Sequence, residues 1–400
     1  MFNQEYEAIV VGAGPAGSIA ARILAENNIK TLVIEKKQEI GTPKRCAEGI
    51  NSSALKRVGL TPDPRWAIRA INGTILYTPS GRPLKVILDD NAGYILERKI
   101  FEKHLAIDAI RKGARYMVKT LATGVIKDKE TACGIKAVHM GKKLDIRSKL
   151  IIAADGVDSK IAKSAGLNTK NTPVDYHSGF QYEMAGLNLD EPNIMHIYFG
   201  NDVAPKGYVW IFPKGEDVAN VGIGILAELS GKGDKAKDYL DRFIKYHPDI
   251  FKDASAIEIN AGGVPVSSSM DSFVMDGLMI TGDAAHQVNP IHGGGMSLAM
   301  NAAKIAAEVG ANAIKEGDVS KERLREYEKI WGETYGVRMR RLMKLRSFLE
   351  KLGDKDFERL TDILTGEDII KLTEARYEFL IKLLVKKAPK MLPLARKFLL

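Results

Sequence analysis

Cysteine is nearly absent from this chain of 400 residues, which has only Cys46 and Cys133. Two cysteines cannot build a disulfide framework, so we expect a protein of a reducing compartment, most simply the cytoplasm. The N-terminus lacks the basic segment of a signal peptide, and its apolar run ends in glycines. No stretch reaches about 18 apolar residues without a charge, so we expect no transmembrane helix.

Two other absences exclude classes of function. Histidine, cysteine and aspartate nowhere show the spacing of metal ligands, so we expect no metal site. The net charge is +9, yet no module of basic and aromatic residues accompanies it, so nucleic acid is not an expected partner. The excess of positive charge either favours an anionic membrane or an acidic partner protein, or has no function.

The beginning of the chain has the pattern of a dinucleotide site. Residues 7–11 (EAIVV) and 31–35 (TLVIE) are short apolar runs that predict buried strands, and residues 15–26 between them predict a helix. The motif G-x-G-x-x-G, at residues 12–17, stands between the first strand and the helix. A strand, a glycine turn, a helix and a second strand in this order predict a βαβ unit that binds a dinucleotide.

Each glycine of this motif has a physical reason. Gly12 permits a tight turn, Gly14 lets the backbone approach a pyrophosphate, and Gly17 lets the helix pack closely on the strand. The free N–H groups at the helix N-terminus would then bind the phosphates. Glu35 ends the second strand, where an acid accepts hydrogen bonds from a ribose diol and repels a 2′-phosphate.

The rest of the chain predicts a discontinuous first domain into which a second is inserted. Residues 150–154 and 278–281 are further buried strands, and each leads into a turn that contains aspartate. Residues 175–266 are mostly strand-like, residues 71–88 predict a hairpin, and the chain after residue 319 is helical. We expect a dinucleotide-binding domain (1–70, 93–160 and 270–315), an antiparallel-sheet substrate domain (71–92 and 161–269) and a C-terminal helical region (316–400).

Two later motifs indicate which dinucleotide binds. Residues 281–285 (TGDAA) resemble the second flavin motif of the hydroxybenzoate-hydroxylase-like flavoproteins, and residues 154–159 (ADGVDS) resemble their middle Asp-Gly motif. The resemblance implies FAD and an α/β fold, a Rossmann-like FAD-binding domain of the hydroxybenzoate-hydroxylase type with an inserted antiparallel sheet. The family's aspartate, here Asp283, contacts the ribityl or ribose part of the cofactor.

Two further segments narrow the family. Residues 44–50 (KRCAEGI) and 205–215 (PKGYVWIFPKG) resemble the Cys-x-Glu-Gly loop and the P-x-x-Y-x-W-x-F-P-x-G segment of the geranylgeranyl reductase family, most closely its archaeal branch. The resemblance implies FAD-dependent saturation of a prenylated glycerophospholipid in membrane lipid synthesis. The family's flavin contacts carry over to Ala16, Glu35, Cys46, Ala47, Gly49, Asp283, Gly295 and Met296.

Two more cofactor contacts are expected from their positions. Arg98 begins the predicted helix 98–112, where such flavoproteins place an arginine that faces phosphate; the alternative is a solvated residue at a helix start. Ala122 lies in the strand after that helix and is expected against the adenine.

Cys46 and Glu48 are candidates for positioning or for proton delivery. A small buried cysteine is often inert, but the basic neighbours Lys44 and Arg45 favour a reactive thiol here. The proposed reaction adds a hydride from reduced FAD to one carbon of an isolated double bond and a proton to the other.

Tyr208 and Trp210 are the other catalytic candidates. Together with Phe212 they alternate along one strand, so their rings share one face and either wall an apolar tunnel for a prenyl chain or fill an ordinary core. Protonation would place positive charge on a tertiary carbon, and aromatic faces stabilise such a charge.

Partners and rival functions complete the expectations. Residues 381–400 carry six Lys/Arg and no acid, which predicts a helix on an anionic membrane surface or, alternatively, a terminal helix packed on the body. No second G-x-G-x-x-G marks a nicotinamide domain, so the electron donor is reduced ferredoxin, another carrier or transiently bound NAD(P)H. The same scaffold also supports aromatic-ring monooxygenases, halogenases and non-catalytic prenyl-binding escort proteins.

Overall fold

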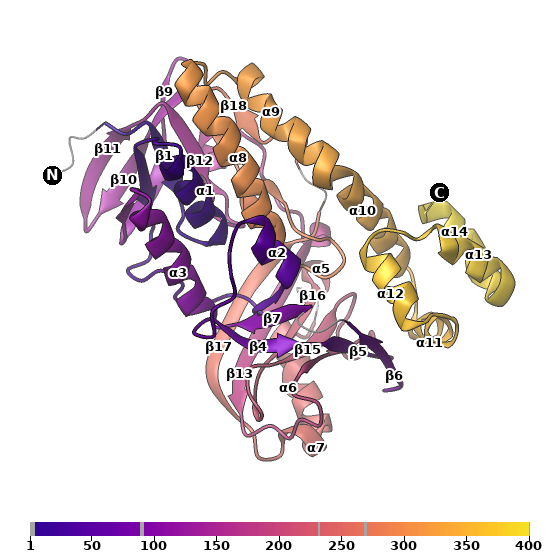
Figure 1. Cartoon of the computed structure of the whole chain (residues 1–400). Coiled ribbons are helices and arrows are strands. Elements are labelled where there is room, and N and C mark those ends of the chain that lie inside the picture. Colours follow the sequence, from indigo (N-terminus) through magenta and orange to yellow (C-terminus); the bar gives the residue numbers. More distant parts are fainter. Residues whose placement is uncertain (1–4, 89–91, 231–232, 268–269, 400) are drawn as a thin grey trace.

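A six-stranded sheet forms the part of the molecule near the N-terminus (Figure 1). The computed structural model describes residues 5–88, 92–230, 233–267 and 270–399. Neighbouring strands are parallel except β18 with β19. Strands β1, β2, β12 and β19 are wholly buried, which explains their continuous apolar sequences. The order is β18 (Val274–Met275), β19 (Leu278–Ile280), β12 (Leu150–Ala153), β1 (Ala8–Val11), β2 (Thr31–Ile34) and β8 (Arg115–Met117).

Helices pack closely on this sheet. α1 (Pro15–Glu26) contacts both α3 (Arg98–Arg111) and α8 (Met296–Glu316), and α8 in turn contacts α9 (Lys321–Trp331). A Cβ at Gly310 of α8 would lie 2.7 Å from a methyl carbon of Leu150, so the helix and the sheet leave no room for a side chain there. The helices predicted over residues 15–26 and 98–112 and from Met296 are confirmed.

Two further sheets have three strands each. The antiparallel sheet β11-β10-β9 contains β9 (Thr120–Asp128), β10 (Thr131–His139) and β11 (Lys142–Arg147). The sheet β3-β7-β4 contains β3 (Gly49–Asn51), β4 (Ala67–Ile71) and β7 (Gly93–Leu96). The short helices α2 (Ser52–Arg57) and α4 (Lys160–Ala165) follow β3 and β12.

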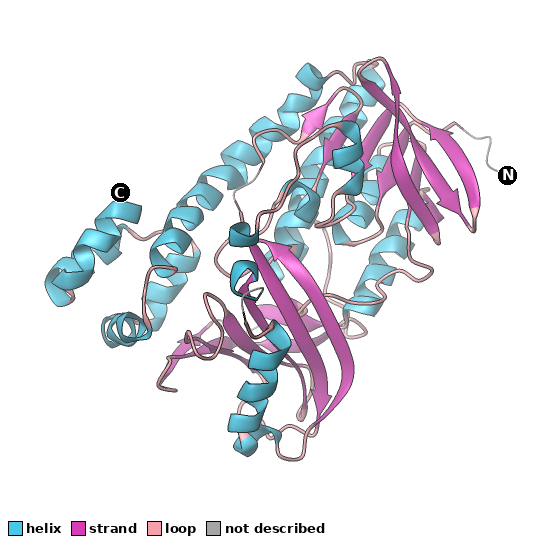
Figure 2. Ribbon diagram, turned by 180° about the vertical axis from the view of Figure 1, so that it is seen from behind, coloured by secondary structure: helices cyan, strands magenta, loops and turns pink. Residues whose placement is uncertain are grey.

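The second large sheet has seven strands. Figure 2 shows it from behind. All neighbouring strands are antiparallel except β14 and β5, and the predicted hairpin around residues 78–83 joins β5 to β6. The order is β17 (Ser255–Pro265), β13 (Tyr176–Ala185), β16 (Val218–Leu226), β15 (Tyr208–Pro213), β14 (Ile194–Tyr198), β5 (Gly73–Tyr77) and β6 (Pro83–Ile87). The exact boundaries of the expected domains stay a prediction.

The expectation that residues 175–266 are mostly strands is wrong for three segments, which are helices. They are α5 (Ala227–Ser230), α6 (Ala236–Tyr246) and α7 (Pro248–Phe251). α6 buries Ala236, Leu240 and Phe243 against the sheet, a helical spacing of four and three residues. The aromatic residues of this stretch favour a strand by composition, but the period of its apolar residues decides the structure.

The C-terminal region is helical, as expected, and has an apolar core of its own. A π-helical turn, Gly332–Gly336, joins α9 to α10. Among the residues with assigned positions, no helix is long and apolar enough to cross a membrane. The helices are α10 (Val337–Leu349), α11 (Asp354–Ile363), α12 (Gly366–Thr373), α13 (Glu378–Lys387) and α14 (Leu392–Leu399).

Arg346 joins this region to the seven-stranded sheet. The residue is 5% exposed, and its guanidinium donates to the carbonyls of Val174 (2.9 Å), two residues before β13, and of Val266, directly after β17. Glu350 accepts a further bond at 2.7 Å. Because the arginine satisfies buried carbonyls on both elements, it fixes α10 against the sheet.

Arg346→Met should lower the free energy of unfolding by about 2–4 kcal/mol, because it leaves buried acceptors and a carboxylate without their donor. Urea unfolding followed by circular dichroism measures the change. Arg359→Met is the control, since its side chain is 54% exposed and pairs with Asp356 at 3.5 Å, and it should cost less than about 1 kcal/mol. Equal losses in the two variants would contradict the role of Arg346.

Candidate functional site

The glycine turn after β1 has the geometry that a pyrophosphate requires. Gly12 has φ +101°, and a Cβ there would lie 2.3 Å from the carbonyl oxygen of Ala154. A Cβ at Gly17 would lie 1.8 Å from the carbonyl oxygen of Gly12. At Gly14, by contrast, a Cβ would meet no described atom within 4 Å. Gly12 and Gly17 are therefore required by packing, whereas Gly14 borders open space at the N-terminus of α1.

Glu35 lies directly beside this turn. One carboxylate oxygen accepts the Ala13 N–H at 2.8 Å, and the other accepts the Lys37 N–H at 2.9 Å. Each oxygen keeps a lone pair that a ribose hydroxyl can use. The N–H of Thr120 donates to the Glu35 carbonyl at 2.8 Å, so strand β9, with the buried Ala122, begins at the same place.

The second motif lies against the same turn. A Cβ at Gly282 would lie 3.4 Å from the Cβ of Ala16, and a Cβ at Gly295 would lie 3.0 Å from a carboxylate oxygen of Asp283. Gly295 immediately precedes Met296, the first residue of α8. Burial raises the pKa of Asp283, and the positive charge of Arg98 partly opposes that rise. The fold thus brings together residues that are more than 260 positions apart in the sequence.

The loop that contains Cys46 is bonded to the seven-stranded sheet. The Cys46 sulfur accepts the Glu48 N–H at 3.1 Å. The carbonyls of Cys46 and Ala47 accept side-chain N–H groups of Gln181 (3.1 Å) and Asn220 (3.2 Å). Since the loop carbonyls are bonded to β13 and β16, the sheet determines how the loop presents its thiol.

Arg98 and Gly49 complete the surroundings of the loop. Arg98 donates its backbone N–H to a Glu48 carboxylate oxygen at 2.7 Å, and its side chain pairs with Glu102 at 2.5 Å. Burial lowers the pKa of Arg98, but its interactions with Glu102 and Cys46 together raise the pKa by more. A Cβ at Gly49 would lie 3.3 Å from the ring of Phe212, so the end of the loop packs on β15.

Strand β15 turns three aromatic rings to one side. Val209 and Ile211 are fully buried on the opposite side, while the alternating residues Tyr208, Trp210 and Phe212 are half-buried. Ring centroids are 5.8 Å apart for Tyr208 and Trp210 and 6.4 Å apart for Trp210 and Phe212.

The polar ends of these rings are bonded to neighbouring elements. The Trp210 indole N–H donates to the Gln181 side chain at 3.0 Å, and the Tyr208 hydroxyl donates to the His292 carbonyl at 2.6 Å. Gly222 of β16 stands opposite Trp210, and a Cβ there would lie 2.3 Å from the indole ring. The sheet is therefore shaped to hold the indole flat against it.

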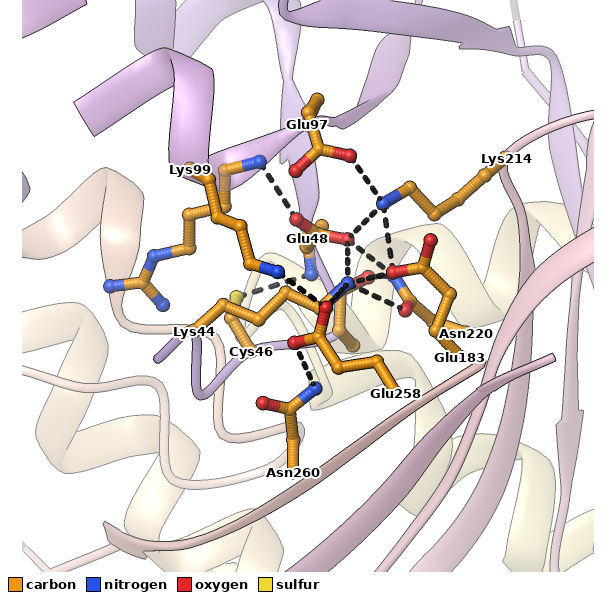
Figure 3. Close-up of polar contacts among 12 residues, drawn as sticks. Lys44, Cys46, Glu48, Glu97, Lys99, Glu183, Lys214, Asn220, Glu258 and Asn260 are labelled. Carbon is orange, nitrogen blue, oxygen red and sulfur yellow. Dashed lines mark hydrogen bonds and ion pairs between the residues drawn. The ribbon is translucent and has the colours of Figure 1, made fainter. Parts of the chain in front are cut away.

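A buried group of charges, which sequence analysis missed, lies at the base of the loop (Figure 3). Lys44 and Lys214 belong to the two segments that resemble the reductase family, but sequence analysis treated Lys44 only as a basic neighbour of Cys46 and gave Lys214 no role. Apart from Glu48, which follows Lys44 by four residues, their partners are on other elements, so local spacing contains little signal for the group. Only the alternation of polar residues on the inner face of β13 and β16 hints at it. The members are Lys44, Glu48, Glu97, Lys99, Glu183, Lys214, Asn220 and Glu258.

A cavity of about 310 Å³ lies on the other side of the seven-stranded sheet. Ile211 lines it, whereas the neighbouring Trp210 and Phe212 point the opposite way. This cavity is therefore not the tunnel expected for a prenyl chain, which stays a prediction. Aromatic rings and imidazoles form part of its wall: Tyr77, His196, Tyr198, Phe199, Phe243 and His247.

Comparison with known proteins relates these features to two family models. Residues 10–46 match the NAD(P)-binding Rossmann-like domain, and residues 175–264 match the geranylgeranyl reductase catalytic domain. The digeranylgeranylglycerophospholipid reductase of Methanocaldococcus jannaschii is 44% identical over 392 residues, which cover 98% of this chain and 97% of that protein.

Solved structures agree with the family models. The crystal structure of a geranylgeranyl bacteriochlorophyll reductase-like protein from Thermoplasma acidophilum has a TM-score of 0.91 and 36% identity and covers 99% of both chains. A flavin-dependent brominase has a TM-score of 0.74 at 20% identity and covers 93% of this chain and 94% of its own. That likeness shows the fold alone, a mixed α/β fold shared with flavin-dependent enzymes.

His177 on β13 gives the stability of the protein a measurable dependence on pH. Its Nε2 is buried and has no partner among the described residues, and burial together with the charge of Arg346 lowers its pKa to about 4. The value in an unfolded chain is about 6.5, so the unfolded state takes up the proton first as the pH falls. The contribution of His177 to stability is therefore lost between about pH 6.5 and pH 4.

Stability should accordingly decrease by about 1–2 kcal/mol between pH 7.5 and pH 5 because of this one residue. Urea unfolding of the wild type and of His177→Gln at both pH values measures the difference, which should be smaller in the variant. His104→Gln serves as the control, because His104 lies on α3 with a side chain that is 24% exposed. An identical pH dependence in the wild type and His177→Gln would refute the prediction.

Proposed function

This chain belongs to the geranylgeranyl reductase family, and from that premise we propose that it saturates isolated double bonds in the geranylgeranyl chains of archaeal-type ether phospholipid precursors. The observation that carries the proposal is the 44% identity to a digeranylgeranylglycerophospholipid reductase over almost the whole chain. The chain is an oxidoreductase of the flavin type that acts on carbon–carbon double bonds in membrane lipid synthesis.

The residues around the glycine turn fit FAD. The open space at Gly14 accommodates a pyrophosphate, Glu35 keeps free lone pairs for a ribose, and Asp155 has a buried carboxylate oxygen without a partner among the described residues. When bound in its reduced form, FAD supplies a hydride. The residues that would hold it are Gly12, Gly14, Ala16, Gly17, Glu35, Cys46, Ala47, Gly49, Arg98, Ala122, Asp283, Gly295 and Met296.

The chain itself contributes orientation, a dry environment and a proton. Tyr208 and Trp210 offer ring faces that stabilise positive charge on the tertiary carbon as the double bond is protonated. The Cys46 thiol is the proposed proton donor. Glu48 positions the loop instead, because its carboxylate is already occupied by two lysines, an amide and a backbone N–H.

The proposed partners are the lipid, an electron donor and a membrane surface. Reduced ferredoxin or NAD(P)H fits as donor, and the positive net charge favours an acidic protein. Within the last helices, Leu384 and Met391 are buried in the C-terminal core, while Val385 is 52% exposed beside lysines. We propose that this basic end of the chain holds the protein peripherally on anionic lipid.

Anaerobic incubation of the dithionite-reduced protein with geranylgeranyl phospholipids should increase the lipid mass in steps of two hydrogens. Mass spectrometry follows the product. A yellow, flavin-loaded protein that leaves the lipid unchanged would indicate an escort protein, and product that appears only with oxygen would indicate a monooxygenase. Either result would overturn the proposal.

Cys46→Ser should lower turnover by at least about tenfold while FAD stays bound, because serine is a far weaker acid than the thiol. Cys133→Ser is the matched control, since Cys133 lies in β10, and it should keep wild-type turnover. Turnover and the flavin absorbance are measured on the same samples. Unchanged turnover in Cys46→Ser would contradict the proposal that the thiol is the proton donor.

Gly14→Ala should weaken FAD binding by about tenfold or more, because the added methyl group enters the space for the pyrophosphate. The protein should still fold, since no described atom lies within 4 Å of that methyl position. Gly332→Ala, with equally free space, is the control and should bind FAD normally. Flavin fluorescence titration measures the affinity, and equal affinities in the two variants would contradict this cofactor placement.

Reversing the charge of four exposed lysines near the C-terminus, Lys382, Lys386, Lys387 and Lys390, to Glu should abolish co-sedimentation with anionic vesicles. Each lysine near such a surface contributes about 1 kcal/mol. The control reverses Lys129, Lys136, Lys142 and Lys143, which are exposed near the β9–β11 sheet. Binding lost equally in both variants would mean that the attraction is not specific to the C-terminal helices.

A further inference from the structure

Lys44 connects the Cys46 loop to the sheet through buried charge (Figure 3). Its side chain has no exposed surface. Its ammonium group contacts the carboxylates of Glu48 (3.1 Å) and Glu183 and the side-chain oxygen of Asn220 (3.4 Å). Lys44 precedes Cys46 by two residues, so its backbone belongs to the loop while its charge is held by β13 and β16.

Lys214 supplies a second ammonium group from the end of β15. It contacts Glu48 at 2.9 Å, Glu97 at 2.9 Å and Glu183 at 3.1 Å, and its side chain is 3% exposed. One oxygen of Glu48 therefore receives both lysines, together with the Asn220 amide at 2.7 Å. The two ammonium groups balance carboxylates that would otherwise repel one another in a medium with little water.

These contacts hold Glu48 in an unusual backbone conformation. Its φ is +73°, in the left-handed region that side chains other than glycine rarely adopt. In this conformation its N–H meets the Cys46 sulfur at 3.1 Å, and its carbonyl accepts the Leu96 N–H at 2.9 Å. The position of the thiol thus depends on a strained residue that the charged group keeps in place.

We propose that Lys44 is a positioning residue for Cys46: its ammonium group, paired with Glu48 and Glu183, fixes the loop of residues 44–50 so that the thiol is held beside the aromatic face of β15. The inference rests on the proposed function for the identity of the reaction. The conformation of the loop, however, is measurable without any lipid.

Two variants distinguish the effect of Lys44 on the position of the loop from its effect on the stability of the fold. Lys44→Met removes the ammonium group that fixes the loop and leaves Glu183 with one positive partner, Lys214, in place of two. Lys44→Met/Glu183→Gln also removes this ammonium group but takes away one charge of each sign, so it should recover much of the lost stability. Lys99→Met is the control, because Lys99 pairs with Glu258 at 2.5 Å from α3 and the structure gives it no bond to the loop.

Hydrogen–deuterium exchange of the flavin-loaded protein should show amides of residues 44–50 exchanging about tenfold faster or more in both Lys44 variants, and unchanged in Lys99→Met. With the reduced protein and lipid, kcat should fall about tenfold or more in both Lys44 variants, while KM for the lipid stays within about threefold. If Lys44→Met does not fold, both measurements are made on the charge-balanced variant Lys44→Met/Glu183→Gln alone.

Recovery of kcat together with stability in the charge-balanced variant would overturn the proposal, since charge balance alone would then be the function of Lys44. Unchanged exchange of the loop in both Lys44 variants would overturn it as well. If the wild-type protein reduces no lipid, the proposed function fails, and the exchange measurement still decides whether Lys44 fixes the loop.

Discussion

Three backbone hydrogen bonds between neighbouring strand ends hold the proposed cofactor site together. Gly12 donates to Ile34 at 2.8 Å, Ala154 to Val11 at 2.9 Å and Thr281 to Ala153 at 3.0 Å. Because β2, β1, β12 and β19 are parallel, their carboxyl ends meet at one edge of the sheet. The glycine turn, the Asp-Gly turn and the second flavin motif are adjacent only for this reason.

Sequence analysis predicted the six-stranded sheet and the turns at its edge well, because the sequence patterns that indicate them are local. A buried parallel strand is a continuous apolar run, and a glycine that must approach backbone leaves its mark at one position, as at Gly12 and Gly17. The helix α6 was not predicted, because its aromatic residues suit a strand as well as a helix. The charged group around Lys44 could not be predicted either, since its members are up to about 214 positions apart and only the folded sheet brings them together.

One side of the seven-stranded sheet stabilises the fold, and the other side carries the aromatic residues proposed to act in the reaction. On one side, Val209, Ile211 and the residues of α6 form an apolar core. On the other side, the ring of Trp210 lies against Gly222 of β16, and the ring of Phe212 lies beside Gly49 at the end of the loop that contains Cys46. The alternation of side chains along β15 thus allows one strand to serve both purposes, and the rigid core behind it limits the movement of the rings.

The group around Lys44 also has a consequence for evolution. A single substitution of Lys44, Glu48, Glu183 or Lys214 leaves a buried charge without its counterpart, which is strongly unfavourable. Replacement of oppositely charged partners in concert is far less costly. Relatives of this chain should therefore either retain the whole group or have exchanged several members at once. These positions, although distant in the sequence, should change together during evolution.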